Sequence, residues 1–187
     1  AEQSLHTFSE APREGTVTGY TRAKKQESAP LPFSLSSLQV LAGKRFGYEP
    51  QLVLDTAQKL YEKKLTTYPR SDSGYLPESM LAEVPTVLDS LVKTDPSLRP
   101  LIERLDRQQR SRAWNDGKVS AHHGIIPTLE PANLSAMSEK ELAVYRLIRA
   151  HYLAQFLPHH EFDRTVPQLT CGGQSLVAVG KQIAVAG

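Results

Sequence analysis

The sequence has little cysteine and no long apolar run. Its 187 residues include a single cysteine, Cys171, which excludes an internal disulfide framework and fits a reducing compartment. The longest apolar runs are far shorter than the roughly 20 residues that a membrane-spanning helix needs. We therefore expect a protein that does not interact with membranes and that works in the cytoplasm.

The composition also lacks a strong excess of charge of either sign. The net charge is +2 and the sequence pI is about 8.7, values that permit nucleic-acid binding but do not argue for it. Hydrophobic residues at 40% and charged residues at 22% are typical of a globular protein and exclude a disordered tail. Because the chain starts at Ala1 and stops at Gly187 inside a strand-like pattern, we interpret it as a piece of a longer protein.

The pattern of apolar residues predicts strands at both ends of the chain and helices between them. Residues 16–21 alternate in the manner of a strand, and residues 161–187 alternate around a Gly172-Gly173 turn, as in a β-hairpin. Polar residues 24–32 are expected to form a linker. The predicted fold class is α+β, mainly α, with a helical domain (32–157) inserted between strands of a partial β domain (1–31 and 158–187).

Several helices are predicted inside the middle segment. One begins after Ser34, and a second starts at Pro50 and closes at Lys63 and Lys64, which suit the negative end of the helix dipole. Further helical patterns start at Pro77 and Pro96. The Ser138-Glu139-Lys140-Glu141 capping box predicts a long helix to about Phe156.

The most informative segment is Thr66-Thr67-Tyr68-Pro69-Arg70-Ser71-Asp72. Proline disfavours a helical conformation at the preceding residue, so Tyr68 is expected in extended backbone. Alternate side chains of an extended segment point to the same side, which would bring Tyr68 and Arg70 together. A phenol beside a guanidinium suits attack on a phosphate or binding of one. The competing interpretation is a surface turn with a half-buried tyrosine.

Two further segments, taken with this motif, resemble the sequence elements of a known protein family. Together with Ala121-His122-His123-Gly124-Ile125-Ile126-Pro127-Thr128 and Pro32-Phe33-Ser34-Leu35-Ser36-Ser37-Leu38-Gln39, the tyrosine segment resembles the type IA DNA topoisomerases, most closely topoisomerase III. The three elements occur in the family's order with family-like spacing over residues 30–157. The terminal strands resemble the family's arch domain only weakly. Two positions differ from the family: Thr66 replaces an isoleucine, and Gly124 replaces an alanine and could loosen the segment that positions His122.

The resemblance implies a role for each matching residue. Tyr68 would attack a phosphodiester of single-stranded DNA and become joined to the 5′-phosphate. Arg70 would hold the scissile phosphate, and His122 would support its hydrogen bonds. Ser71 and Asp72 would support the loop, Asp72 either by a local hydrogen bond or by tuning Arg70. A free phenol has a pKa of about 10, so it is a weak nucleophile at neutral pH until cations or a general base assist it.

The resemblance also implies what the reaction needs from outside this chain. The covalent link conserves the phosphodiester energy, so resealing needs no ATP, in keeping with the absence of a G-x-x-x-x-G-K-[ST] loop. Magnesium would bind to acidic residues of a separate domain of the parent enzyme, with no metal site here. The isolated fragment is therefore expected not to relax DNA. We expect a monomeric enzyme in the bacterial cytoplasm, associated with the nucleoid or a mobile element.

Other candidate sites have competing interpretations. Lys63 and Lys64 would lie where the DNA backbone passes, or would only complete a helix. Arg110 and Arg112, with Arg107, Lys118 and Trp114, would form a phosphate-binding stripe with a stacking aromatic, or a solvated helix end with Trp114 inside. The pairs His122-His123 and His159-His160 suggest zinc only weakly, since adjacent residues seldom ligate one metal. The alternative to an enzyme is a non-catalytic helical module that binds DNA or protein.

Overall fold

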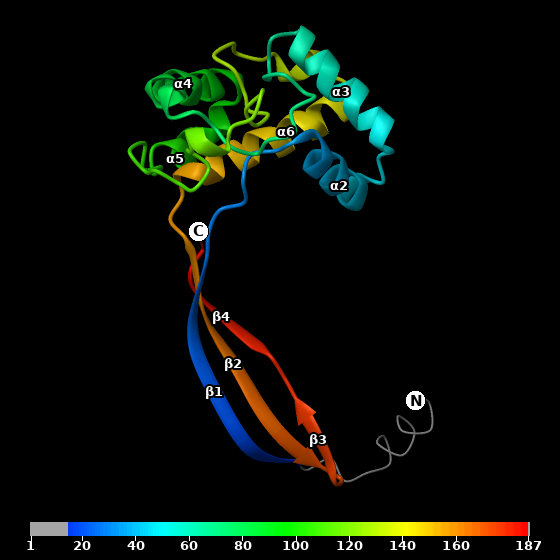
Figure 1. The fold of residues 1–187 in the computed structure, drawn as a ribbon, viewed down its shortest axis with the longest axis vertical. Helices are drawn as coiled ribbons and strands as arrows, with labels where there is room; N and C mark the ends of the chain where they lie inside the picture. Colours follow the sequence, from blue (N-terminus) through cyan, green and yellow to red (C-terminus); the bar gives the residue numbers. More distant parts are fainter. Residues whose placement is uncertain (1–14, 187) are drawn as a thin grey trace. The chain divides into compact units, whose positions relative to one another are not determined.

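The computed structural model describes residues 15–186, which divide into two compact units. One unit is helical and comprises Ser28–Leu157; the other consists of strands from the described residues before and after it (Figure 1). Each unit is described by itself below. The fold is thus mixed helix and antiparallel sheet, as the sequence predicts, whereas the assignment of the strands to an arch domain stays a prediction.

The strand unit is one antiparallel sheet built around a central strand. β2 (His160–Cys171) pairs with β1 (Gly15–Glu27) along its whole length, from Gly15 opposite Cys171 to Glu27 opposite His160. Its other edge pairs with β3 (Gln174–Val177) and then with β4 (Gly180–Val185). The β2–β3 hairpin turns at Gly172 and Gly173, whose φ angles of 55° and 76° explain the two glycines.

The first strand is longer than the sequence predicts. The expected linker at residues 24–32 is wrong up to Glu27, because β1 continues through a polar stretch with no apolar alternation. Pairs across the sheet support this stretch: Arg22 lies 2.5 Å from Asp163, and Gln26 donates a hydrogen bond to Glu161 at 3.3 Å. Such pairing depends on β2, which follows more than a hundred residues later in the chain.

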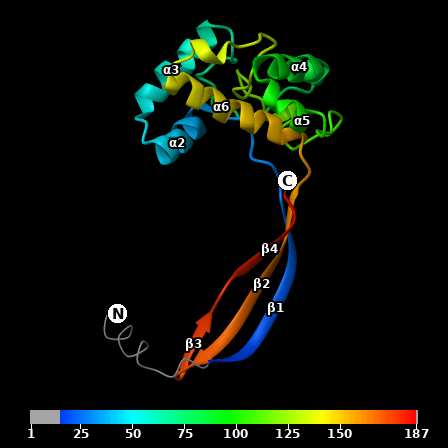
Figure 2. The ribbon, with the colours of Figure 1, turned by 180° about the vertical axis from the view of Figure 1, so that it is seen from behind.

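The helical unit holds helices where the sequence predicts them (Figure 2), but the two that were expected from Pro77 and Pro96 begin as 3₁₀ helices. Residues 78–83, expected to begin an α-helix, form a 3₁₀ helix, and the α-helix starts only at Val84, with Pro85 in its first turn. The α-helices are α2 (Leu35–Phe46), α3 (Pro50–Glu62), α4 (Val84–Thr94), α5 (Arg99–Ile102) and α6 (Glu139–Leu153). The 3₁₀ helices are η1 (Glu78–Glu83), η2 (Pro96–Leu98), η3 (Asp116–Lys118), η4 (Leu134–Ala136) and η5 (Ala154–Phe156).

Capping residues set the ends of the main helices. Ser34 begins α2 and Ser138 begins α6, each in a reciprocal capping box, and Pro50 occupies the first turn of α3. Gly47 ends α2 with a φ of 70°, the left-handed conformation that glycine adopts without strain. These are the boundaries that sequence signals predict best.

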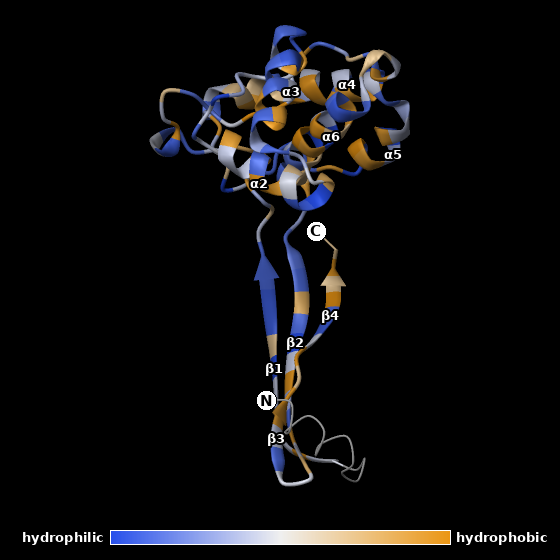
Figure 3. Cartoon of the chain, turned by 90° about the vertical axis from the view of Figure 1, so that its right-hand side faces the viewer, coloured by the Kyte–Doolittle hydropathy of each residue, from blue (hydrophilic) through white to orange (hydrophobic). Residues whose placement is uncertain are grey.

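The buried core lies within the helical unit. Its side chains come from α2, α3, α4 and α6 and from the segments between them, with Leu38, Leu60, Leu88 and Ile148 fully buried. Figure 3 shows the same contrast by hydropathy, with apolar residues gathered among the helices and a largely hydrophilic sheet. No helix within residues 15–186 is long and apolar enough to cross a bilayer.

Candidate active site

Tyr68 lies in a short segment that leaves the end of α3. Lys63 and Lys64 follow the helix in a turn, and Lys64 has a φ of 60°, which is uncommon for a residue other than glycine. The Lys64 carbonyl accepts a hydrogen bond from the Thr128 hydroxyl, and the Lys64 amide donates to the carbonyl of Tyr61 at 2.8 Å. The turn therefore reverses the chain and directs residues 65–68 toward the segment that carries His122.

The predicted extended conformation ends at Tyr68. Pro69 and Arg70 lie in a turn, with Pro69 buried and Arg70 exposed, so the inference that Tyr68 and Arg70 share one face of an extended segment is wrong. Proline suits this position because its fixed φ favours the second residue of a turn. The half-buried tyrosine at a turn matches the competing interpretation of the local geometry. Its chemical role depends on the neighbours that other segments supply.

The tyrosine segment is joined to residues 124–128 by a short ladder of hydrogen bonds. The Thr67 amide donates to the carbonyl of Ile126 at 2.9 Å, and Thr66 pairs with Pro127 as in an antiparallel bridge. The Thr67 hydroxyl accepts from the Ile126 amide at 3.0 Å and donates to the carbonyl of Gly124 at 3.2 Å. One side chain thus fixes both segments, which places Tyr68 and His122 next to each other.

The Tyr68 ring lies between two other rings. Its centroid is 4.5 Å from that of His122, with the planes tilted by 42°, and 5.7 Å from that of Tyr61, which meets it edge-on at 82°. Within the described part of the chain, the Tyr68 hydroxyl has no hydrogen-bond partner. The ring is therefore held in place while its hydroxyl is left available to a ligand.

Residues after the turn tie the loop to the same neighbour. Ser71 is 1% exposed; its hydroxyl lies 3.4 Å from the carbonyl of His122, and its own carbonyl accepts from the Leu35 amide at 2.8 Å. Ser71 is therefore a structural residue rather than a surface contact. The Ser73 amide donates to the Ser71 hydroxyl at 3.2 Å, which closes the loop on itself.

Asp72 connects the tyrosine loop to the segment before His122. The Ser120 hydroxyl donates to its carboxylate at 2.6 Å. This hydrogen bond, a local backbone bond and the nearby His122 ring lower the pKa of Asp72 below its usual value. Asp72 therefore stays ionised at neutral pH. Its contact with Ser120, not with Arg70, supports the loop-fixing role among the two that the sequence left open.

The cationic side chains predicted near Tyr68 differ in whether an acidic residue is paired with them. Lys63 lies 2.6 Å from Glu141, a buried residue of the α6 capping box, and this contact together with the hydrogen bonds from Ser138 lowers the pKa of Glu141 to about 2. The side chains of Arg70 and Lys64, by contrast, have no partner among the described residues. Arg70 and Lys64 are thus the two predicted cations next to Tyr68 that no carboxylate neutralises.

The arginine-rich segment is not organised as a stacking stripe. Trp114 is 7% exposed and packs against Phe156, with ring centroids 6.3 Å apart. The prediction that Trp114 stacks on a base is therefore wrong. The alternative, a helix end with Trp114 packed inside, is right for this residue. Arg112 donates to the carbonyl of Ala29 at 3.5 Å, and Arg110 to that of Gln108 at 2.9 Å. Both guanidinium groups remain exposed, and their contact with DNA stays a prediction.

Close packing explains why position 124 is a glycine, and the sequence alone does not reveal this packing. A β-carbon placed there would lie 3.0 Å from that of Pro32 and 3.3 Å from the backbone of Gly74. The glycine therefore allows residues 32, 74 and 124 to approach closely. The sequence suggests that this glycine loosens the His122 segment, whereas the tight contacts indicate that it lets the segment pack.

A cavity of about 530 Å³ lies at the tyrosine segment, lined in part by Tyr61, Lys64, Tyr68 and Thr128. Its volume is within the range of about 300–1,000 Å³ that small-molecule sites occupy. Tyr61 and Thr67 were not among the predicted site residues. The helical spacing of Tyr61 indicates a core position, yet it is 40% exposed, and the conformation of the Lys63-Lys64 turn is what brings it to Tyr68.

The acidic, histidine and cysteine side chains of the described residues are dispersed rather than clustered. No group of three or more histidine, cysteine, aspartate or glutamate side chains in residues 15–186 is placed to hold a metal ion. Where the magnesium that the resemblance implies would bind stays a prediction. What the site does assemble is a phenol, an imidazole and the exposed cation of Lys64, with the exposed Arg70 two residues further along the chain than Tyr68. Such groups suit an anion such as a phosphate.

Comparison with known proteins gives this site a family. The whole chain, residues 1–187, matches the family model described as DNA topoisomerase. DNA topoisomerase 3 of Vibrio cholerae is 43% identical over 173 residues, which make up 92% of this chain and 27% of that protein. The corresponding protein of Salmonella typhimurium is 45% identical over 172 residues, 91% of this chain and 26% of that protein. The chain thus spans about a quarter of the length of these relatives.

A solved structure shares the fold. Topoisomerase I from Thermotoga maritima superimposes with a TM-score of 0.63 over 99% of this chain and 30% of its own, at 22% sequence identity. A likeness at that identity concerns the fold alone, whereas the family follows from the match over all 187 residues. This chain belongs to the DNA topoisomerase family, as a type IA, topoisomerase III-like sequence.

Proposed function

We propose that this chain is the nucleophile-bearing part of a type IA DNA topoisomerase and that Tyr68 is the nucleophile. The observation that carries the proposal is the placement of Tyr68, with its ring fixed between Tyr61 and His122 and its hydroxyl without a partner in the described residues. Tyr68 is only half-buried and lines a cavity, so its hydroxyl can be reached by a ligand. An oriented and accessible hydroxyl suits a group that reacts with that ligand.

The proposed reaction is a reversible transesterification on single-stranded DNA. The phenolic oxygen of Tyr68 attacks the phosphorus and loses its proton, while the bond from phosphorus to the 3′-oxygen breaks and that oxygen gains a proton. The product is a 5′-phosphotyrosine link and a free 3′-hydroxyl. Attack by the 3′-hydroxyl restores the strand, so the cycle of cleavage, strand passage and resealing consumes no ATP.

Arg70 and His122 are proposed to stabilise the negative charge that develops on the phosphate. Arg70 is exposed and unpaired, so its guanidinium can turn to donate two parallel hydrogen bonds to phosphate oxygens. His122 stands against the Tyr68 ring, within reach of the same phosphate. Lys64 adds a second exposed cation on the path of the backbone, whereas Lys63 is already paired with Glu141.

Magnesium is proposed to bind elsewhere in the parent enzyme, to acidic residues outside this chain. Because the described residues hold no such cluster, the chain alone is proposed to be unable to relax supercoiled DNA. A relaxation assay with the 187-residue chain and magnesium tests this, and clear activity would refute it. The parent is further proposed to act as a monomer in the bacterial cytoplasm, on nucleoid or mobile-element DNA.

The test of the nucleophile is Tyr68→Phe in the full-length parent. Phenylalanine keeps the ring contacts with Tyr61 and His122 and removes only the hydroxyl. We expect the covalent DNA adduct to disappear while single-stranded DNA binding stays within about twofold. The competing proposal, a non-catalytic module that binds DNA or protein, requires the same change to leave every measurable activity as it was.

A further inference from the structure

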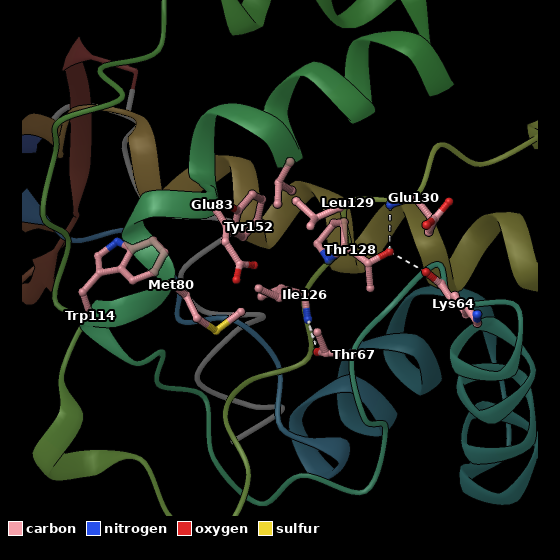
Figure 4. Close-up of a pocket in the computed structure, with 12 residues that line it drawn as sticks. Lys64, Thr67, Met80, Glu83, Trp114, Ile126, Thr128, Leu129, Glu130 and Tyr152 are labelled. Atoms are coloured by element: carbon pink, nitrogen blue, oxygen red, sulfur yellow. Dashed lines mark hydrogen bonds between the residues drawn. The ribbon is translucent and has the colours of Figure 1, made fainter.

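A second cavity, of about 320 Å³, lies on the helical unit and is mostly apolar (Figure 4). Its walls include the rings of Trp114 and Tyr152, which are 7% and 1% exposed and therefore fixed by packing. Met80 and Ile126 complete this end of the cavity (Figure 4). The volume is large enough for a ligand with one aromatic ring.

Glu83, which is exposed to solvent, turns its carboxylate toward this apolar end. Figure 4 shows the Glu83 side chain directed between Met80 and Trp114 on one side and Tyr152 and Ile126 on the other. The charge of Glu83 acts on the Tyr152 hydroxyl, where it adds to burial in raising the pKa of that phenol. Within the described residues no cation is paired with Glu83.

The other charges of the cavity are at its far end. Lys64 and Glu130 line the cavity on the side away from Glu83 (Figure 4). The end near Glu83 thus combines an unpaired anion, two aromatic rings and a polarisable thioether. This combination favours a planar cation, since the rings attract positive charge at their faces and the carboxylate accepts two parallel hydrogen bonds from an amidinium.

We propose that this cavity is a binding site for small planar organic cations of the aromatic amidine class, with Glu83 as the anchoring anion. The proposal goes beyond the DNA reaction and does not depend on Tyr68. The two sites are nevertheless adjacent, because Lys64, Thr67 and Thr128 line both this cavity and the one at the tyrosine segment.

The chain offers a direct readout of binding. Trp114 is its only tryptophan and lines the cavity, so indole fluorescence reports on changes around this one residue. The probe is benzamidine, and the matched neutral control is benzamide, which has the same shape without the charge. Glu83→Gln removes the anion with almost no change in volume, and Glu130→Gln makes the same change at the far end of the cavity.

We expect benzamidine to change the fluorescence saturably, with a Kd on the order of 1 mM for so small a ligand. Benzamide, and benzamidine with Glu83→Gln, should each bind at least about tenfold more weakly, as expected when a charged hydrogen bond is lost. Glu130→Gln should stay within about twofold. A ligand-dependent rise in melting temperature provides a second readout. Equal binding of benzamide, no saturable change in the folded wild type, or an equal loss with Glu130→Gln would overturn the proposal.

Discussion

The ion pair between Lys63 and Glu141 gives the sharpest stability prediction, because its two roles can be separated by substitution. Glu141 accepts from Lys63 at 2.6 Å and also closes the α6 capping box by accepting from the Ser138 amide at 2.9 Å. Glutamine can still accept from Ser138, as in many capping boxes, but carries no charge. Glu141→Gln therefore removes the ion pair and keeps the cap, whereas Glu141→Ala removes both.

The magnitude follows from the pKa of Glu141, which falls from 4.5 to about 2 mainly through Lys63 and then through Ser138. At about 1.4 kcal/mol per unit of pKa, the upper limit is about 3 kcal/mol. Lys63 is 47% exposed while Glu141 is 9% exposed, so screening reduces the part due to the ion pair to about 1–2 kcal/mol. We expect Glu141→Gln to cost that much at pH 7, and Glu141→Ala about 1 kcal/mol more.

The pH dependence has a fixed sign. Since the pKa of Glu141 is lower in the folded chain than in the unfolded chain, its contribution is complete above about pH 5 and is lost as the pH falls toward 2. Urea unfolding followed by circular dichroism should show the difference between wild type and Glu141→Gln shrinking over this interval. Lys63→Met should cost at least as much at pH 7, since it leaves a buried carboxylate unpaired. A difference that is absent at pH 7, or that is the same at pH 7 and pH 2.5, would refute the reasoning.

Three further changes probe the tyrosine site. Gly124→Ala should destabilise the chain by about 1 kcal/mol in urea unfolding, because its β-carbon would lie 3.0 Å from that of Pro32; a more stable variant would contradict the close packing. In the full-length parent, Tyr61→Leu should slow formation of the covalent adduct by about tenfold through loss of the edge-on contact with Tyr68, while Tyr61→Phe retains the rate; equal rates would exclude a positioning role. Asp72→Asn should weaken the hydrogen bond from Ser120 and raise hydrogen exchange at residues 118–123 without lowering the melting temperature. In the wild type the same loosening should appear as the pH falls through the lowered pKa of Asp72.

The sequence predicts best those features that local chemistry decides. The capping boxes at Ser34 and Ser138, the proline that opens α3 and the Gly172-Gly173 hairpin all lie where their signals place them. Each depends on hydrogen bonds or dihedral angles within a few residues. The motifs that resemble the family can likewise be recognised from the sequence, because they depend only on residue types and their order and not on the fold.

Features set by distant segments were not predictable in the same way. The extended segment ends at a turn at Pro69 and Arg70, and the residues before that turn, 66–67, are held by residues 124–127 from a distant part of the chain. Trp114 is buried by Phe156, and the polar end of β1 is held by strand β2. The partnership of Lys63 with Glu141 likewise joins positions 78 residues apart. In each instance tertiary contacts, not local preference, decide the outcome.

The central claim is that Tyr68 is the residue that becomes joined to DNA. The most direct measurement is to trap the full-length parent on single-stranded DNA, digest the complex with nuclease and trypsin, and locate the nucleotide by mass spectrometry. Trypsin cleaves after Lys64 and Arg70, so we predict that the peptide of residues 65–70 carries a 5′-phosphonucleotide on the Tyr68 oxygen. An adduct on another residue, or none in a preparation that relaxes DNA, would contradict the assignment.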